Sequence, residues 1–263
     1  MQVSKSGFYK WLLTKDAKNT KLSQLEEAVI KTHASSKGRY GKRRVFAIIK
    51  NTFPNVGKKK VAKIMFKFNL FGIGKAKFKK TTEVSKKARH CPDLVVGHFE
   101  CSKQDELWTS DISYVWTKEG WLYLSVILDA FSRHIIGWSL QENMKKEIVL
   151  NSLNAAFKKR CGFKKGIIFH SDKGTQYSSN EVKYYLLANG FYQSMSNSCY
   201  DNSITETFFA TIKKELIYQC SFLTKQEAKC AIVEFIETYY NRVRIHSSLG
   251  YLSPMQYELK YGT

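Results

Sequence analysis

A change in the spacing of apolar residues near residue 106 limits the folds open to this chain more than any other feature of its sequence. Three segments rich in aromatic and β-branched residues follow one another there, at 107–116, 122–128 and 134–140. The breaks between them are short, and segments of this composition joined by short breaks predict three antiparallel strands connected as hairpins.

Helices and strands alternate after the third of these segments. We expect, in order, a helix at 145–160, a strand at 166–170, a helix at 179–189, a strand at 191–195 and two helices at 202–217 and 225–240. The resulting order, β-β-β-α-β-α-β-α-α, predicts an α/β fold with a mixed sheet and flanking helices, as in ribonuclease-H-like folds.

The first 69 residues show helical spacing instead. A short amphipathic helix is expected at 23–35, a second opens at 39–44, and a third follows the turn at 54–57. The apolar residues expected to face inward are Val45, Ile48, Ile49, Val61, Ile64, Met65 and Phe68. Two short helices around a tight turn predict a small all-α helix-turn-helix domain, although a three-helix bundle with a solvated cationic surface has the same pattern.

Basic residues are concentrated in the same part of the chain. Residues 1–90 hold 24 Lys or Arg and 4 Asp or Glu, whereas the remaining 173 residues hold 19 and 18. So dense a positive charge attracts polyanions and predicts DNA or RNA as the partner, and the helix-turn-helix pattern favours DNA. The candidate DNA contacts in this region are Arg39, Lys42, Arg43, Arg44, Lys58, Lys59, Lys60, Lys63 and Lys67.

Residues 70–103 contain glycines, a proline and a lysine-rich run, and this composition predicts a basic linker to a second domain at 104–263.

The six cysteines are scattered without a CxxC pair and no secretion signal is visible, so we expect free thiols in a cytoplasmic protein. No apolar run is long enough to predict a membrane helix. Zinc is not expected, because the spacing of His90, Cys91, His98 and Cys101 fits no zinc module.

Three acidic residues fall where the predicted fold would bring them together. Asp111 lies within the first strand, Asp172 just beyond the fourth, and Glu206 on the helix after the fifth. Carboxylates are what Mg²⁺ requires, and two such ions clamp the attacking and leaving oxygens of a phosphoryl transfer. Each acid also has a structural alternative: an edge-strand residue, a turn residue and an exposed first-turn residue, respectively. Asp129 and the pair 201–202 are assigned to a hairpin turn and a helix cap.

Helix geometry separates Glu206 from Glu215 on the same predicted helix. Glu206 lies off the apolar stripe that is expected to pack on the sheet, and Lys213, seven positions on, returns to the face of Glu206. Glu215 lies on the opposite side and roughly 13 Å further along the axis. The stripe consists of Ile204, Phe208, Ile212 and Leu216.

Short strings along almost the whole chain carry a family resemblance. They are Val3–Tyr9, Arg39–Arg44, Trp108–Tyr114, Asp129–Arg133, Gly137–Trp138, His170–Tyr177, Cys199–Asn202, Glu206–Phe209, Lys213–Glu215, Tyr240–Arg242 and His246–Tyr251. With them the chain resembles the OrfB product of the insertion-sequence-three family of bacterial transposases, whose core resembles retroviral integrases. Ser113 departs from the family's usual Thr, and the segment between Asp172 and Glu206 is about two residues short.

The resemblance implies a cut-and-join reaction at terminal inverted repeats, in which an exposed 3′-hydroxyl attacks a second phosphodiester. It implies that Asp111, Asp172 and Glu206 hold Mg²⁺, with Mn²⁺ as a substitute. His170 and Lys213 are expected near DNA, with a packed strand-end residue as the alternative for His170. The implied partners are double-stranded DNA of the terminal repeats and target, an OrfA product or OrfA–OrfB fusion, and further copies of the chain, at the bacterial nucleoid.

Two other functions remain open at this point. A nuclease of the same fold would cut DNA without joining it, and an inactive or domesticated regulator would bind DNA without cutting. The three carboxylates argue against the regulator. The strongly basic first third of the chain argues against a small housekeeping ribonuclease.

Overall fold

The computed structural model describes residues 4–74, 91–160, 166–196 and 202–262. The chain divides into two compact units, Met1–Ala76 and Lys77–Thr263. Along the described parts of the chain, no helix combines the length and the apolar character needed to cross a membrane.

The first unit contains the three expected helices, but the first of them is much longer than predicted. Helix α1 runs from Lys5 to Ser35, α2 from Lys42 to Thr52 and α3 from Lys58 to Lys67. The Ser4 side chain caps the start of α1 by accepting a hydrogen bond from the Gly7 amide. The early part of α1 was missed because it has no apolar stripe, and its aromatic residues are exposed to about one half.

The core of the first unit is built from one face of each helix. Leu25 and Val29 on α1, Val45 and Ile49 on α2, and Val61, Ile64 and Met65 on α3 are all buried. The prediction that Phe68 faces inward was wrong, since it is 37% exposed. Phe68 is the C-cap residue that follows the last residue of α3, so it no longer follows the helical spacing.

The second unit is built on a five-stranded mixed sheet. Its strands are β1 (Leu107–Thr117), β2 (Gly120–Asp129), β3 (Ile135–Gln141), β4 (Ile168–Ser171) and β5 (Tyr192–Met195), in the spatial order β3-β2-β1-β4-β5. The first three strands pair antiparallel, whereas β4 pairs parallel with β1 and with β5. This arrangement confirms the predicted ribonuclease-H-like fold.

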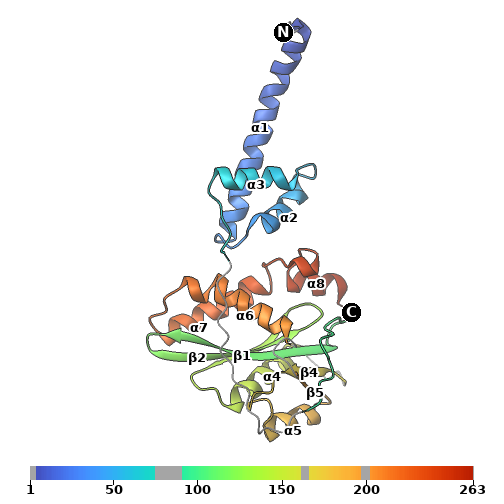
Figure 1. Cartoon of the computed structure of the whole chain (residues 1–263), viewed down its shortest axis with the longest axis vertical. Coiled ribbons are helices and arrows are strands. Elements are labelled where there is room, and N and C mark those ends of the chain that lie inside the picture. The colour runs from blue at the N-terminus through green and yellow to red at the C-terminus, as the bar shows by residue number, and fades with distance from the viewer. Residues whose placement is uncertain (1–3, 75–90, 161–165, 197–201, 263) are drawn as a thin grey trace. The chain divides into compact units, whose positions relative to one another are not determined.

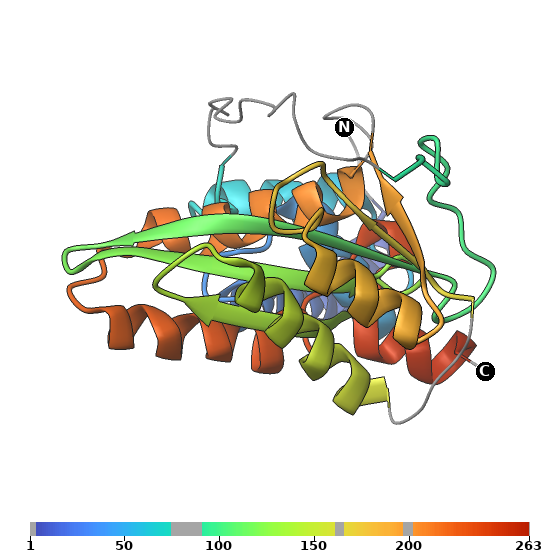
Figure 2. The ribbon, with the colours of Figure 1, turned by 90° about the horizontal axis from the view of Figure 1, so that it is seen from below.

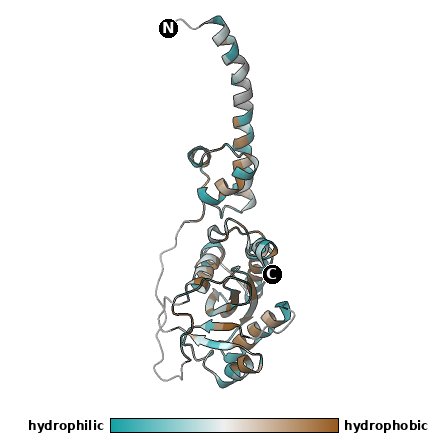
Figure 3. Ribbon diagram, turned by 90° about the vertical axis from the view of Figure 1, so that its right-hand side faces the viewer, coloured by the Kyte–Doolittle hydropathy of each residue, from teal (hydrophilic) through white to brown (hydrophobic). Residues whose placement is uncertain are grey.

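Helices cover both faces of the sheet (Figure 1). On one face lie α4 (Lys146–Arg160) and α5 (Asn180–Ala188), and on the other α6 (Ser203–Glu215) and α7 (Lys225–Val233), so that the sheet forms a middle layer (Figure 2). Hydrophobic residues gather in the interior of this unit (Figure 3). Gly137 on β3 lets α4 approach closely, because a Cβ there would overlap the backbone of Ser152 and Ala156.

The last predicted helix, 225–240, is not a continuous α-helix. It changes after Val233 into the π-helical segment η2 (Glu234–Tyr240), and α8 (Pro254–Tyr261) follows near the end of the chain. At the end of η2 the Asn241 side chain accepts a hydrogen bond from the Ile135 amide and donates one to the Ile135 carbonyl. These bonds tie the C-terminal segment to β3.

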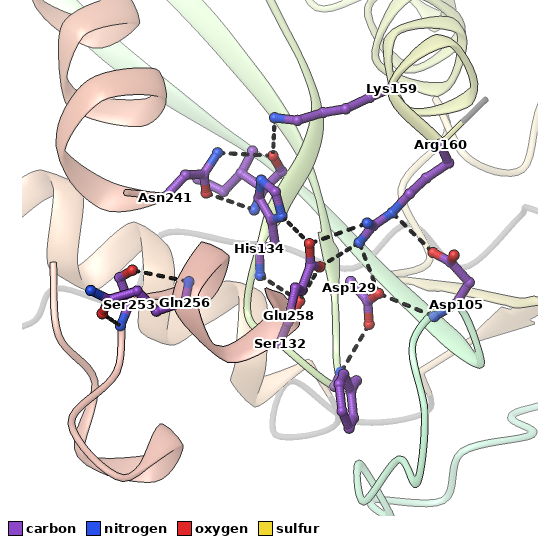
Figure 4. A network of polar contacts seen from close by, with 12 residues as sticks. Asp105, Asp129, Ser132, His134, Lys159, Arg160, Asn241, Ser253, Gln256 and Glu258 are labelled. Atoms are coloured by element: carbon purple, nitrogen blue, oxygen red, sulfur yellow. Dashed lines mark hydrogen bonds and ion pairs between the residues drawn. The ribbon is translucent and has the colours of Figure 1, made fainter. Parts of the chain in front are cut away.

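A buried polar network attaches α8 to the sheet (Figure 4). Arg160, the last residue of α4, makes ion pairs with Asp105 (3.1 Å), Asp129 (3.0 Å) and Glu258 (2.6 Å). Glu258 also accepts hydrogen bonds from Ser132 and His134, both in the turn between β2 and β3. The Asp129 carboxylate accepts from the Phe131 amide and so closes that turn, as expected.

This network predicts how stability depends on pH. Burial alone would raise the pKa of Glu258, but hydrogen bonds from His134 and Arg160 lower it from 4.5 to about 2. A lowered pKa in the folded state stabilises the fold above the unfolded-state value of 4.5, and this contribution is lost as pH falls toward 2. Glu258→Gln should therefore lower the free energy of unfolding by up to about 3 kcal/mol at pH 7.

Urea unfolding of both proteins at pH 7, 5 and 3.5 checks this. The difference between wild type and Glu258→Gln should shrink between pH 5 and 3.5. Glu147→Gln, a change at an exposed residue of α4, should have little effect at any of these pH values. A difference that is equally large at pH 3.5 and pH 7 would contradict the assignment.

Candidate active site

The sheet brings Asp111 and Asp172 together through one register. In the parallel pair of β1 and β4, Thr109 lies opposite His170. Asp111 and Asp172 each follow these partners by two residues, so they reach the same level of the sheet, Asp111 within β1 and Asp172 just beyond the end of β4. The Asp111 carboxylate accepts a hydrogen bond from the Ile112 amide (2.7 Å), and that of Asp172 from the Gly174 amide (3.0 Å).

Two hydrogen bonds hold the start of α6 against β1 beside Asp111. The Asn202 side chain donates to the carbonyl of Ser110 (2.9 Å), and the Thr205 hydroxyl donates to the Thr109 hydroxyl (2.8 Å). The predicted apolar stripe of α6 is buried along its whole length. Glu206, the residue after Thr205, is exposed and lies in the first turn of the helix.

The role expected for Asn202 as a helix cap was only partly right. Asn202 occupies the N-cap position of α6, but its side chain makes no capping hydrogen bond and reaches across to β1 instead. Asp201, the other candidate, lies outside the described residues. Neither the Asn202 nor the Thr205 contact was predicted, because a side chain that joins a helix to a distant strand leaves no periodic signal in the sequence.

The three carboxylates influence one another electrostatically. Burial, together with the negative charges of Asp172 and Glu206, raises the pKa of Asp111 to about 8. Burial also raises the pKa of Asp172, and partial desolvation of the Glu206 carboxylate raises that of Glu206. Lys213 acts in the opposite direction on Asp111. The site therefore concentrates negative charge that a cation would stabilise.

Lys213 lies beside this cluster on the face of α6 that helix geometry predicted. Its ammonium group is 5.5 Å from the centre of the Tyr114 ring, three residues beyond Asp111 on β1. Tyr177 lies on the other side of Asp111, where its hydroxyl is 2.9 Å from that of Ser110. Burial, together with Asp111 and Asp172, raises the pKa of Tyr177 well above 10, so this phenol stays protonated.

His170 and Glu215 do not belong to the exposed part of the site. His170 is fully buried, hydrogen-bonded to Ser194 (2.9 Å) and packed against the Phe99 ring, so the expected DNA contact was wrong and the packed strand-end alternative was right. Glu215 forms a buried ion pair with Arg244 (2.9 Å) and accepts a hydrogen bond from Tyr239.

The basic candidates of the first unit lie mostly on its surface. Lys42 and Arg43 on α2 and the lysines of α3 are exposed, whereas Arg39 and Arg44 are half-buried. Lys67 is engaged in an ion pair with Glu26 (2.9 Å), and Lys58 lies over the Phe46 ring. The exposed lysines remain placed to contact a polyanion.

No three His, Cys, Asp or Glu side chains in the described ranges already lie close enough together to hold a metal ion. For the cysteines that were weighed as zinc ligands, Cys91 donates a hydrogen bond to Gln193, and burial raises the pKa of Cys101 to about 12. His90 lies outside the described residues. Cys91 and Cys101 are free thiols.

Comparison with known proteins places these elements in a wider group. Integrase core domain models match residues 102–199 and 206–261, and an HTH-like domain model matches residues 21–78. The chain is 37% identical to the transposase for insertion sequence element IS904 of Lactococcus lactis, over 92% of this chain and 94% of that protein. It is 32% identical to transposase InsF for insertion sequence IS3A of Escherichia coli, over 99% of this chain and 92% of that protein.

Among solved structures, one match is a chain of the simian T-cell lymphotropic virus intasome. It is 13% identical, with a TM-score of 0.47 over 87% of this chain and 73% of that one.

The different surroundings of the two glutamates on α6 give a stability prediction. Glu215→Gln leaves the Arg244 guanidinium buried without its carboxylate, so it should lower the free energy of unfolding by about 3–5 kcal/mol. Glu206→Gln changes an exposed residue and should alter it by less than about 0.5 kcal/mol. Urea unfolding followed by tryptophan fluorescence measures both, since four of the five tryptophans lie in the second unit.

A double variant, Glu215→Met with Arg244→Met, is the matched control, because removing both charges avoids the unpaired arginine. It should be more stable than Glu215→Gln alone. Equal losses for Glu206→Gln and Glu215→Gln would show that the two residues do not differ as the structure describes.

Proposed function

The chain belongs to the IS3 family of insertion-sequence transposases and is a DNA transposase with an integrase core; from that premise we propose that Asp111, Asp172 and Glu206 are its catalytic carboxylates. The observation that carries this proposal is the shared register of β1 and β4, which brings two aspartates to one level of the sheet where β4 ends. The Asn202 and Thr205 hydrogen bonds bring the helix of Glu206 to the same strand.

We propose that these carboxylates hold Mg²⁺, or Mn²⁺ in its place. Their chemistry fits, because hard divalent ions take carboxylate oxygens, and burial together with the neighbouring carboxylates disfavours the charged form of Asp111 unless a cation is present. When bound, the ions supply Lewis-acid activation of the attacking oxygen and stabilisation of the leaving one.

The residues around the carboxylates have separate tasks in this proposal. Lys213 binds a non-bridging oxygen of the reacting phosphate, since its ammonium lies beside Asp111 and has no carboxylate of its own among the described residues. The apolar stripe of α6 and the Thr205 hydroxyl keep the helix fixed while the DNA strand is cut and joined. No side chain of the chain needs to form a covalent bond with DNA.

The DNA substrate is proposed to be the terminal inverted repeats of the element, and then a target duplex. Residues 1–69 would bind the duplex through the exposed basic residues of α2 and α3. Residues 70–103 would link this region to residues 104–263, which would cut and join the DNA strands. We further propose an OrfA product or fusion and other copies of the chain as partners, at the nucleoid in the bacterial cytoplasm. Family membership disfavours the regulator and the simple nuclease.

Substitution of the proposed ligands tests the catalytic assignment. Asp111→Asn, Asp172→Asn and Glu206→Gln should each reduce cleavage and joining of a labelled terminal-repeat duplex by roughly 10²–10³-fold or more with Mg²⁺. Binding of the duplex should be retained, because none of these residues belongs to the basic first unit. Glu215→Gln, assayed at equal folded concentration, should keep most activity; the reverse result for the two glutamates would show that the third carboxylate is misassigned.

The basic surface of α3 gives a separate test. Replacing Lys58, Lys59 and Lys60 together with Gln should lower the slope of log affinity against log salt by about 3, because each lost phosphate contact removes roughly 0.9. The control replaces three exposed lysines of the second unit, Lys118, Lys145 and Lys183, with Gln. An unchanged slope for the first variant would argue against α3 as a DNA-binding element.

A further inference from the structure

Arg133 occupies a backbone position that does not suit its side chain. It lies in the turn between β2 and β3 with φ at 62°, in the left-handed region that L residues rarely adopt and that favours glycine. Glycine would adopt this conformation without strain and would keep the hydrogen bond of the turn, which the residue 133 backbone amide donates to the carbonyl of Asp129. An arginine at such a position indicates that the side chain itself has a use.

The guanidinium of Arg133 is partly buried yet has no acidic partner. Across the parts of the chain that the structure describes, no ion pair or hydrogen bond engages it, whereas Arg160 contacts three carboxylates and Arg244 contacts Glu215. Burial lowers the pKa of Arg133, and the groups that oppose this are Tyr240 and Cys101, not carboxylates. A partly buried cation without a counter-ion is costly unless a ligand supplies the negative charge.

Arg133 forms part of the wall of a cavity of about 360 Å³. The hydroxyl-bearing residues Ser248 and Tyr257 also line the cavity, and so do Leu249 and the exposed Glu100. Asp129 at the start of the turn and Glu258 on α8 are already paired with Arg160. The cavity thus offers a planar cation and two hydroxyls, with one acid at its surface.

This combination suits a phosphodiester better than other ligands. A guanidinium binds two phosphate oxygens at once, and hydroxyls donate to the same group. A metal ion is disfavoured because the cavity wall is cationic. Phe99, another wall residue, packs against His170, whose strand partner Thr109 stands two residues before Asp111. A DNA strand that passes the carboxylates can therefore continue toward this cavity.

We propose that Arg133, assisted by Ser248 and Tyr257, binds one backbone phosphate of the DNA outside the catalytic centre. The proposal rests on the proposed function, since it takes the ligand to be the strand that the carboxylates process. It gives a role to the strings Asp129–Arg133 and His246–Tyr251, which the catalytic assignment leaves unexplained.

The test measures how the loss of charge at one DNA phosphate changes binding to the wild-type protein and to a variant at residue 133. A set of terminal-repeat duplexes is prepared, each with one uncharged methylphosphonate at a different position along the repeat and its flank. With wild type, one substitution in the set should weaken binding about tenfold through loss of the Arg133 contact. With Arg133→Gln, that position should become insensitive while the other sensitive positions stay as they were.

Two further variants separate binding from folding. Arg133→Gly should keep the thermal unfolding midpoint or raise it, because glycine suits the left-handed turn, yet it should bind DNA as weakly as Arg133→Gln. Lys183→Gln, an exposed charge on α5, should leave the interference pattern unchanged. If Arg133→Gly instead lowers the midpoint and Arg133→Gln keeps the wild-type pattern, the arginine is structural and the proposal is wrong.

The remaining outcomes are also decisive. An unchanged interference pattern accompanied by a shift in oligomeric state would assign Arg133 to a carboxylate on another copy and overturn the phosphate site. Cleavage and joining by wild type are measured on the same unmodified duplex. Their absence would count against the proposed carboxylate function, whereas a pattern that responds to Arg133→Gln would still support the phosphate site.

Discussion

The parallel pairing of β1 with β4 is the constraint on which the rest of the second unit depends. Because Thr109 lies opposite His170, the two aspartates that follow lie at one level of the sheet, where β4 ends. A slip of one residue would turn Asp111 to the other face of the sheet. The helix of Glu206 is attached to the residues immediately before Asp111, so its position follows from the same pairing.

Charge pairing distinguishes structural from functional polar groups in this fold. Arg244 is buried and Arg160 is mostly buried, and each is matched by carboxylates from segments distant in sequence, which fastens the C-terminal elements to the core. The cluster around Asp111 has an excess of negative charge, and the cavity around Arg133 an unmatched positive one. We propose a divalent cation and a DNA phosphate as the complements of these two sites.

The sequence predicted those features that depend on side-chain periodicity. Aromatic and β-branched runs located the strands of the sheet, and the four-residue spacing of Ile204, Phe208 and Ile212 assigned the buried face of α6 and set Glu215 apart from Glu206. The early part of α1 escaped prediction because it lacks an apolar stripe. The π-helical segment after α7 did too, since it differs from an α-helix in backbone hydrogen bonds alone.

Residues whose role depends on tertiary contacts were the least predictable. His170 was misplaced because a polar residue at a strand end has the same sequence signature whether it faces solvent or packs under another segment, as it does here against Phe99. The most direct test of the central claim is Mn²⁺ binding to the full-length protein, followed by electron paramagnetic resonance. Wild type should bind Mn²⁺ in competition with Mg²⁺, and folded Asp111→Asn should lose that binding. Equal affinity and stoichiometry in the two proteins would contradict the claim that these carboxylates form the metal centre.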